Sequence, residues 1–163
     1  MSRTFSAKPA TLRPLGWVIA IVVFGLDQGS KSWVVGALAD GHRVEVIPGV
    51  LHLTYVRNSG AAFSLGVGST FYFALFSLIV GIAIALFGGH RKELWLPMAL
   101  ILGGVLGNLT DRIFRAPGGM KGHVVDWLEL PHWPIFNIAD SAVVLAATII
   151  VISALYQRKR TDA

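Results

Sequence analysis

The sequence contains no cysteine, and few of its residues carry charge. Without cysteine the chain forms neither disulfides nor a thiolate zinc site. Charged residues make up 14% of the 163 residues, whereas a soluble domain carries about 25%. Hydrophobic residues account for 54%, more than a short chain can bury in a water-soluble core. These values exclude a disordered chain, argue against a soluble enzyme and predict a single membrane domain over residues 1–163.

Four apolar runs are long enough to cross a bilayer, which takes roughly 17–25 residues. They cover approximately residues 15–35, 70–87, 94–113 and 138–155. Asp27 and Lys31 stand in the first run where a signal peptide would carry small cleavage-site residues, so we interpret this run as a membrane span. The fold prediction is an all-α integral membrane protein with four transmembrane helices.

The segments between the spans predict a small amount of extracytoplasmic β-structure. Apolar residues alternate with polar ones over 43–46 and 51–55, on either side of the turn dipeptide Pro48-Gly49. This pattern is typical of a β-hairpin. The segment 116–136 begins Ala-Pro-Gly-Gly and holds two further prolines, so it is predicted to be a loop with room for a short helix or strand.

Lysine and arginine in short flanking segments set the orientation of membrane proteins. Basic residues occur in both tails and, as Arg91 and Lys92, between the second and third spans. An even number of spans puts these segments on one side, so both termini are predicted to be cytoplasmic. The opposite segments hold basic residues as well, including Arg43 and Arg115. The net charge of +5 is attributed to this bias, and no nucleic-acid partner is predicted.

Several ionisable residues fall in or at the ends of the spans, where insertion of each costs roughly 2.5–3.5 kcal/mol. Asp27, Asp111 and Asp140 are the carboxylates among them. With the predicted orientation all three lie at one level near the outer surface, and Asn58 and Asp126 lie on outer segments at the same level. The inner ends of the spans hold nothing comparable, so the sequence predicts a polar site at the outer face.

Carboxylate chemistry is the reaction type that the residues favour. Ser30 and Lys31 are adjacent and would point apart on a helix, and no His-Glu-x-x-His pattern predicts a metal site. Two close aspartates share a proton and can activate water without a cofactor. Physical reasoning alone leaves open which two of the four aspartates pair. It also leaves open that Asp27 and Lys31 form a structural ion pair and that Asn108 makes an interhelical hydrogen bond.

Five short blocks, in order along nearly the whole chain, resemble the lipoprotein signal peptidase (signal peptidase II) family. The blocks are DQGSK at 27–31, NSGAAF at 58–63, GNLTDR at 107–112, VVDW at 124–127 and FNIADS at 136–141. Trp127 replaces a phenylalanine that is frequent in the family. The stretch 126–136 is short for the family and 116–123 is extended, which affects the expected shape of the outer loops and the substrate preference.

The resemblance implies a bacterial inner-membrane aspartic endopeptidase with four membrane helices and a small outer β-cradle. Its substrates would be prolipoproteins modified with diacylglycerol, cut just before the modified cysteine. Asp126 and Asp140 would be the catalytic pair. Other positions would line or support the site: Asn108, Arg112, Asn137, Asp27, Lys31 and Asn58, with Asp111 as a neighbour. No cofactor or metal is implied, the expected partners are prolipoproteins and membrane lipid, and we expect a monomer.

Two other functions compete with this interpretation. A subunit of a proton-coupled transporter would need buried carboxylates as a relay, with polar residues continuing into the inner half of the spans. A non-catalytic assembly factor would not need Asp126 and Asp140 together.

Overall fold

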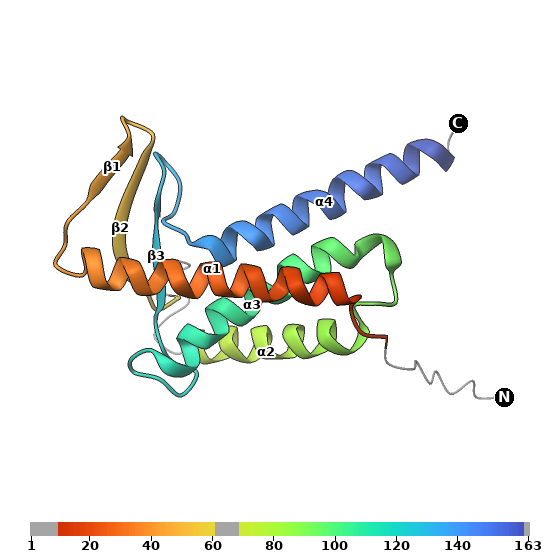
Figure 1. Ribbon diagram of the computed structural model, residues 1–163, viewed down its shortest axis with the longest axis horizontal. Helices are drawn as coiled ribbons and strands as arrows, with labels where there is room; N and C mark the ends of the chain where they lie inside the picture. The colour runs from red at the N-terminus through yellow and green to blue at the C-terminus, as the bar shows by residue number, and fades with distance from the viewer. Residues whose placement is uncertain (1–9, 61–68, 162–163) are drawn as a thin grey trace.

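A bundle of helices carries a small sheet at one end in the computed structural model, which describes residues 10–60 and 69–161 (Figure 1). The elements, in chain order, are α1 (Pro14–Leu38), β1 (Val44–Ile47), β2 (Leu51–Asn58), α2 (Ser69–Phe87), the short 3-10 helix η2 (Lys92–Leu94), α3 (Trp95–Phe114), β3 (Val124–Glu129) and α4 (Ile138–Thr161). The start of α1 and the end of α4 lie at the end of the bundle away from the sheet (Figure 1). We call the two ends the sheet end and the terminal end.

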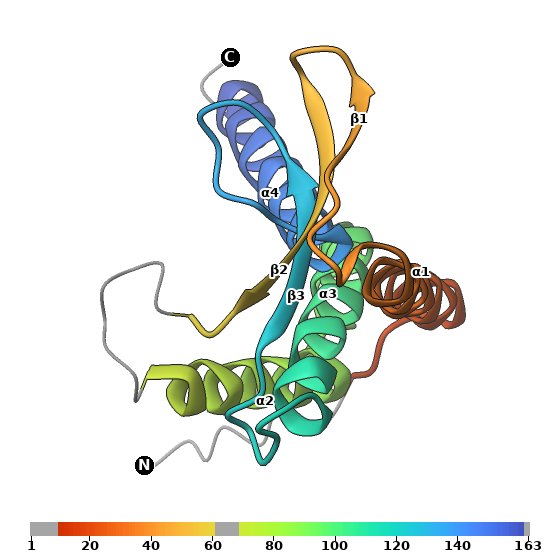
Figure 2. The ribbon, with the colours of Figure 1, turned by 90° about the vertical axis from the view of Figure 1, so that its left-hand side faces the viewer.

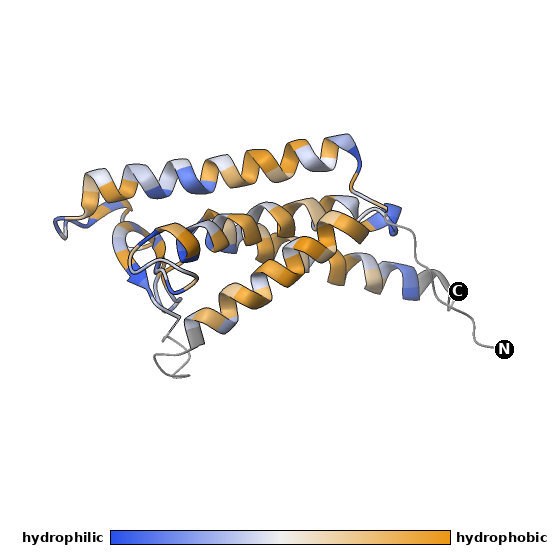
Figure 3. Cartoon of the chain, turned by 90° about the horizontal axis from the view of Figure 1, so that it is seen from below, coloured by the Kyte–Doolittle hydropathy of each residue, from blue (hydrophilic) through white to orange (hydrophobic). Residues whose placement is uncertain are grey.

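Four helices are long and apolar enough to cross a membrane, which confirms the predicted fold class. Hydrophobic residues extend along their lengths (Figure 3). Helix α3 lies at the centre of the bundle. Of its most apolar stretch, 44% is buried inside the protein, whereas the value for the other three helices is 17–22%. The outward faces of α1, α2 and α4 therefore carry exposed apolar side chains, as expected for surfaces that face lipid.

Glycines let α1 and α3 approach each other closely. A Cβ atom added at Gly103 would lie 2.7 Å from the carbonyl oxygen of Ala20, and one at Gly107 would lie 2.5 Å from Asp27 Oδ2. No side chain fits at either distance, so Gly103 and Gly107, which are four residues apart, form a small-xxx-small helix contact. The same approach brings the polar residues of α1 within hydrogen-bonding distance of α3.

The sheet has three antiparallel strands in the order β1-β2-β3. Strands β1 and β2 form the predicted hairpin, and β3 adds to it a strand from the segment predicted as loop. The register of β2 and β3 pairs Val56 with Asp126 and Asn58 with Val124. The sheet lies across the ends of α1 and α3 (Figure 2). It packs through Val125 onto Val34 and Leu38 of α1, so this contact fixes Asp126 relative to the bundle.

Two parts of the predictions fall outside the described residues. They are the N-terminal tail up to residue 9 and the end of the second family block, Ala61 to Phe63.

Candidate active site

A buried ion cluster joins α1 to α3 beneath the sheet. Lys31 Nζ lies 2.8 Å from Asp27 Oδ2 and 2.9 Å from Asp111 Oδ2, and all three side chains are fully buried. The third acceptor of this ammonium is Asn108 Oδ1, at 2.8 Å. An ammonium group has three donors, so the charge of Lys31 is fully partnered. The predicted pairing of Asp27 with Lys31 is confirmed, and its partners give it a structural role.

The two aspartates of this cluster extend it to other elements. Asp27 Oδ1 accepts a hydrogen bond from the backbone N–H of Ala139 at 3.0 Å, which ties α1 to the first turn of α4. Asp111 Oδ2 accepts from the backbone N–H of Val125 in β3 at 3.1 Å. Asp111 Oδ1 lies 2.6 Å from Arg115 Nε. Two carboxylates are thus balanced by two cations, and the cluster joins four elements, α1, α3, α4 and β3, around the site.

A second polar group surrounds a cavity of about 160 Å³ at the sheet end. Its lining residues come from β2 and the residues after it, from β3 and from three helices: Asn58, Gly60, Phe73, Asn108, Arg112, Val124, Asp126 and Asp140. Asp126 enters from β3 and Asp140 from the first turn of α4, so the sheet and the bundle each contribute one carboxylate. The side chains of this pair are the only carboxylates that line the cavity among the described residues.

Asn137 holds the two carboxylates of the cavity in a fixed relation. Its Nδ2 donates to Asp126 Oδ1 at 2.6 Å. Its Oδ1 accepts from the backbone N–H of Asp140 at 2.9 Å, and its own N–H donates to Asp140 Oδ2 at 3.2 Å. These reciprocal bonds are those of a capping box at the start of α4. The local sequence Asn-x-x-Asp thus begins the helix and positions both members of the pair.

Neutral amides supply the remaining partners of the pair. Asn58 Nδ2 donates to Asp126 Oδ2 at 2.8 Å, and Asn108 Nδ2 donates to Asp140 Oδ1 at 2.8 Å. Asn108 therefore bridges α3 to α4 and also contacts Lys31, which confirms the predicted interhelical hydrogen bond. Both oxygens of each carboxylate accept one bond, and none of these four donors carries a charge.

Burial raises the pKa of Asp126 to about 6. The loss of hydration disfavours its charged form, and the nearby charge of Asp140 acts in the same direction. Hydrogen bonds from Asn58 and Asn137 oppose the shift because they stabilise the carboxylate. Asp126 is only 3% exposed, which agrees with burial as the main cause. Asp126 can therefore hold a proton near neutral pH.

Arg112 gives the cavity a positive charge. Its guanidinium carbon lies 5.9 Å from the centroid of the Phe73 ring, a cation–π distance. Among the described residues its Nη1 is buried with no hydrogen-bond partner. The cation interacts electrostatically with Asp126, Asp111 and Asp140. A donor left unpaired beside the two carboxylates is available to a molecule that enters the cavity.

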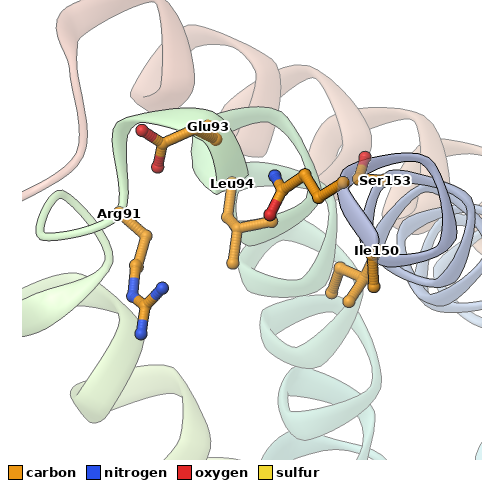
Figure 4. A pocket seen from close by; sticks show the side chains of 7 residues that line it. Arg91, Glu93, Leu94, Ile150 and Ser153 are labelled. Atoms are coloured by element: carbon orange, nitrogen blue, oxygen red, sulfur yellow. The ribbon is translucent and has the colours of Figure 1, made fainter. Parts of the chain in front are cut away.

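Another cavity, of about 430 Å³, lies at the terminal end between α4 and the connection of α2 to α3 (Figure 4). Arg91, Glu93 and Leu94 line it on one side, and Ile150 and Ser153 line it on the other. It is larger than the cavity at the aspartate pair, but Glu93 is its only carboxylate among the described residues. Of these two cavities, only the one at the sheet end is therefore lined by two carboxylates among the described residues.

Within the described ranges, no three histidine, cysteine, aspartate or glutamate side chains gather as ligands of a metal ion. The site consists of amide groups and one guanidinium group around two carboxylates. Such a site can bind a peptide group and exchange protons with it.

The family model of signal peptidase (SPase) II matches residues 19–156, most of the chain and every element from α1 to α4. The chain belongs to the signal peptidase II family. Lipoprotein signal peptidase of Mycobacterium tuberculosis H37Rv is 43% identical over 152 residues, which are 92% of this chain and 75% of that protein. The protein of the same name from Rhodococcus jostii is 43% identical over 145 residues, covering 88% and 73% of the two chains.

Solved structures described as bacterial membrane enzymes share the fold of this signal peptidase II family member. One superposes with a TM-score of 0.76 and 28% identity over 91% of this chain and 97% of its own. A second gives 0.75 and 27% identity over 94% and 95%. Together with the four apolar helices, these relatives identify the chain as a multi-pass bacterial membrane protein.

The structure places all nine residues predicted for the signal peptidase II site in two connected groups. The ion cluster holds Asp27, Lys31 and Asp111, and the cavity group holds Asn58, Asn108, Arg112, Asp126, Asn137 and Asp140. Sequence reasoning did not assign two further residues to the site. Gln28 Nε2 donates to the carbonyl of Gly107 at 3.0 Å, and Arg115 binds Asp111. Arg115 follows Asp111 by four residues, a spacing that predicts such a pair.

Proposed function

We propose that this protein is an aspartic endopeptidase that removes signal peptides from prolipoproteins, cutting just before a diacylglyceryl-modified cysteine. The observation that carries the proposal is the pair Asp126 and Asp140, joined through Asn137 at one small cavity. Membership of the signal peptidase II family supports the substrate class. Relatives named lipoprotein signal peptidase support it as well.

The environments of the two carboxylates suggest which one acts as general base and which as general acid. Asp140 lies in the first turn of α4, where the helix dipole favours a negative charge. Asp126, whose pKa is raised to about 6, is the better proton carrier. We therefore assign the ionised form to Asp140 as general base and the protonated form to Asp126 as general acid. The pair titrates as a unit, so this assignment describes the state that begins the reaction.

In the proposed reaction a water molecule attacks the scissile carbonyl carbon and gives a proton to Asp140. Asp126 donates its proton to the carbonyl oxygen, so a neutral gem-diol forms. Asp140 then protonates the leaving amine while a diol hydroxyl returns its proton to Asp126, and the carbon–nitrogen bond breaks. The products are a signal peptide with a new carboxyl group and a lipoprotein with a free α-amino group. Arg112 supports the charge that develops during transfer, and Asn58, Asn108 and Asn137 hold the pair.

We further propose a monomer in the inner membrane, acting as one membrane domain, with both termini cytoplasmic and the aspartate pair near the outer face. The positions of the basic residues support this orientation. Reporter fusions at Ala163 and near Gly118 should report opposite sides of the membrane. The same side for both fusions would contradict the orientation.

The buried polar residues speak against a proton relay across the membrane. Those in the described part of the chain are Asp27, Lys31, Thr70, Asp111, Asp126 and Asn137. Their places are the second half of α1, the start of α2, the end of α3, strand β3 and the position before α4, which are the parts of these elements nearer the sheet. A relay would need such groups in the terminal half as well.

Cleavage of a diacylglyceryl-modified prolipoprotein by the purified protein tests the proposal directly. We expect cleavage before the modified cysteine, seen as a mass change of both products. The matched controls are the same prolipoprotein with unmodified cysteine and the Asp126→Asn protein. Failure to cleave the modified substrate in a lipid environment would contradict the proposed function.

A further inference from the structure

An apolar groove lies beside Asp140. Its volume is about 430 Å³. Its α4 wall consists of Ser141, Val144, Leu145 and Thr148, which share one face of the helix by their spacing of three and four residues. Leu130, Trp133 and Phe136, from the connection between β3 and α4, form the opposite wall. Asp140 lines both the groove and the polar cavity, so the two spaces adjoin at this member of the aspartate pair.

The hydroxyl groups of the α4 wall and the backbone groups of Phe136 are already engaged. Ser141 Oγ donates to the carbonyl of Asn137, and Thr148 Oγ1 donates to the carbonyl of Val144, both at 2.9 Å. Phe136 exchanges backbone hydrogen bonds with Leu128 of β3, which occupies its N–H and its carbonyl. An extended peptide in this groove would leave its own backbone groups without partners, at a cost of several kcal/mol for each group in a lipid environment. The groove is therefore unsuited to an extended peptide.

The groove is also unsuited to a helical segment of substrate next to the cut. Residues beside a scissile bond must be extended to reach both carboxylates, and the groove starts directly at one of them. A lipid chain attached to the residue after the cut has neither restriction. It carries no hydrogen-bonding groups along its length, and it leaves the peptide immediately beside the cleaved bond.

We propose that the groove along α4 binds an acyl chain of the diacylglyceryl group on the substrate cysteine. This inference rests on the proposed function, because it takes the lipid-modified cysteine as the residue after the cut. The exposed apolar face of α4 continues from the groove toward the terminal end through Val151, Ile152 and Leu155. A chain lying in the groove can therefore pass from the aspartate pair directly into the bilayer.

Binding here positions the substrate more than it adds affinity. Transfer of an acyl chain from the bilayer to an apolar groove gains little, because lipid tails are as apolar as the groove. The chain instead fixes the cysteine relative to Asp140, and small displacements of a reacting group reduce turnover strongly. Filling the groove should lower kcat/KM for long-chain substrates.

The test compares two substrates with two tryptophan variants in lipid vesicles. The substrates are one prolipopeptide carrying either a dipalmitoylglyceryl or a diacetylglyceryl group. Val144→Trp fills the groove, and Val22→Trp on α1 is the control, since the two valines are 58% and 51% exposed on different helices. We expect Val144→Trp to lower kcat/KM for the dipalmitoyl substrate about tenfold and to change the diacetyl substrate less than about twofold. Val22→Trp should alter neither.

An equal loss on both substrates, or no loss from Val144→Trp, would overturn the inference. A second measurement uses a dipalmitoyl-type substrate with a photoreactive group on one acyl chain, bound to the Asp126→Asn protein. We expect its label on residues 141–148 of α4, and a label confined to α1 or α2 would also overturn the inference. If the unaltered protein cleaves neither substrate, the proposed function itself fails, and this outcome is distinct from a failure of the groove assignment.

Discussion

At the sheet end of the bundle Lys31 is fully buried between two carboxylates, whereas at the terminal end Arg91, Lys92 and Glu93 are exposed. The same residue types thus occur in opposite environments within one set of helices. Buried charges require complete sets of partners, because an unpaired one costs several kcal/mol. Exposed charges at a membrane boundary need none, since water and lipid headgroups solvate them. The charges at the sheet end are therefore held in a fixed geometry by their partners, and a site for proton transfer requires such a geometry.

Loss of either carboxylate at the sheet end should have the largest effect. We expect Asp126→Asn and Asp140→Asn each to reduce cleavage by at least about 10³-fold, since each removes one partner of the proton transfer. Asp111→Asn should be milder, because Asp111 belongs to the ion cluster. Glu93→Gln at the terminal end is the control and should retain turnover. Near-normal turnover of Asp126→Asn with an inactive Asp111→Asn would show that the carboxylates are wrongly assigned.

Removal of the buried cation should cost more stability than removal of an exposed one. Lys31→Met leaves Asp27 without its cation, and we expect a destabilisation of about 3–5 kcal/mol, measured by unfolding in detergent. Lys92→Met, at an exposed position of the terminal end, should change stability by less than about 0.5 kcal/mol. The double variant Asp27→Asn with Lys31→Met should recover part of the loss, because Asp111 keeps Arg115. Equal effects of the two lysine changes would remove the contrast between the ends.

A methyl group at the close contact of α1 and α3 should destabilise the sheet end by overpacking. Gly107→Ala places a Cβ atom 2.5 Å from Asp27 Oδ2, so we expect a loss of about 1–3 kcal/mol through overpacking. Gly25→Ala in α1 meets no atom within 4 Å and should be neutral or stabilise by up to about 1 kcal/mol. Thermal unfolding of both variants tests the difference. An unchanged melting temperature for Gly107→Ala would mean that the helices move apart without cost.

The pH profile should reveal which carboxylate holds the proton. Asn58 stabilises the ionised form of Asp126, so Asn58→Ala should raise the pKa of Asp126 further above about 6. If Asp126 is the proton donor, its deprotonation sets the alkaline limb of kcat/KM, and this limb should move to higher pH. Arg57→Ala, a neighbouring change on β2, is the control and should leave the limb in place. A shift of the acid limb instead would reverse the roles of Asp126 and Asp140.

Changes confined to the terminal end should have the smallest effect on each inserted molecule. Replacing Arg158, Lys159 and Arg160 with Gln weakens the orientation signal, so it should lower the amount of correctly inserted protein. Turnover per inserted molecule should stay within about twofold, since no group at the sheet end changes. Removal of Met1–Ala10 should likewise leave turnover per inserted molecule within about twofold. A large loss from this truncation alone would show that the terminal end takes part in catalysis.

Hydropathy and helical spacing predict the four helices, the hairpin and the pairing of Asp27 with Lys31, because each depends on residues close in sequence. The strand β3 was less predictable, since the glycines and prolines around it favour a loop and its stability comes from pairing with β2. The choice of Asp126 over Asp111 came from the family resemblance. Both lie near the same end, and only the three-dimensional fold separates the carboxylate that faces Lys31 from the one that faces the cavity.

Gln28 could not be predicted as a partner of the site from local spacing. Adjacent residues on a helix point in different directions, so the proximity of Gln28 to Asp27 carries no signal of its own. Its contacts with Gly107 and Asp111 depend on the close approach of α1 and α3. Gln28 belongs to the block DQGSK that resembles the family, but only the packing of α1 against α3 shows its role.

The capping box at Asn137 holds the first turn of α4 in place, so the rest of the helix can tilt about this turn. With 24 residues, α4 is about 36 Å long at a rise of 1.5 Å per residue. A change in bilayer thickness alters helix tilt, and a tilt of about 10° about the first turn would displace the far end of α4 by about 6 Å. Asp140 lies at the pivot, where the same rotation produces almost no displacement, and Asn137 ties it there to Asp126. The long arm of the helix can thus follow a membrane that thins or thickens while the spacing of the two carboxylates stays constant.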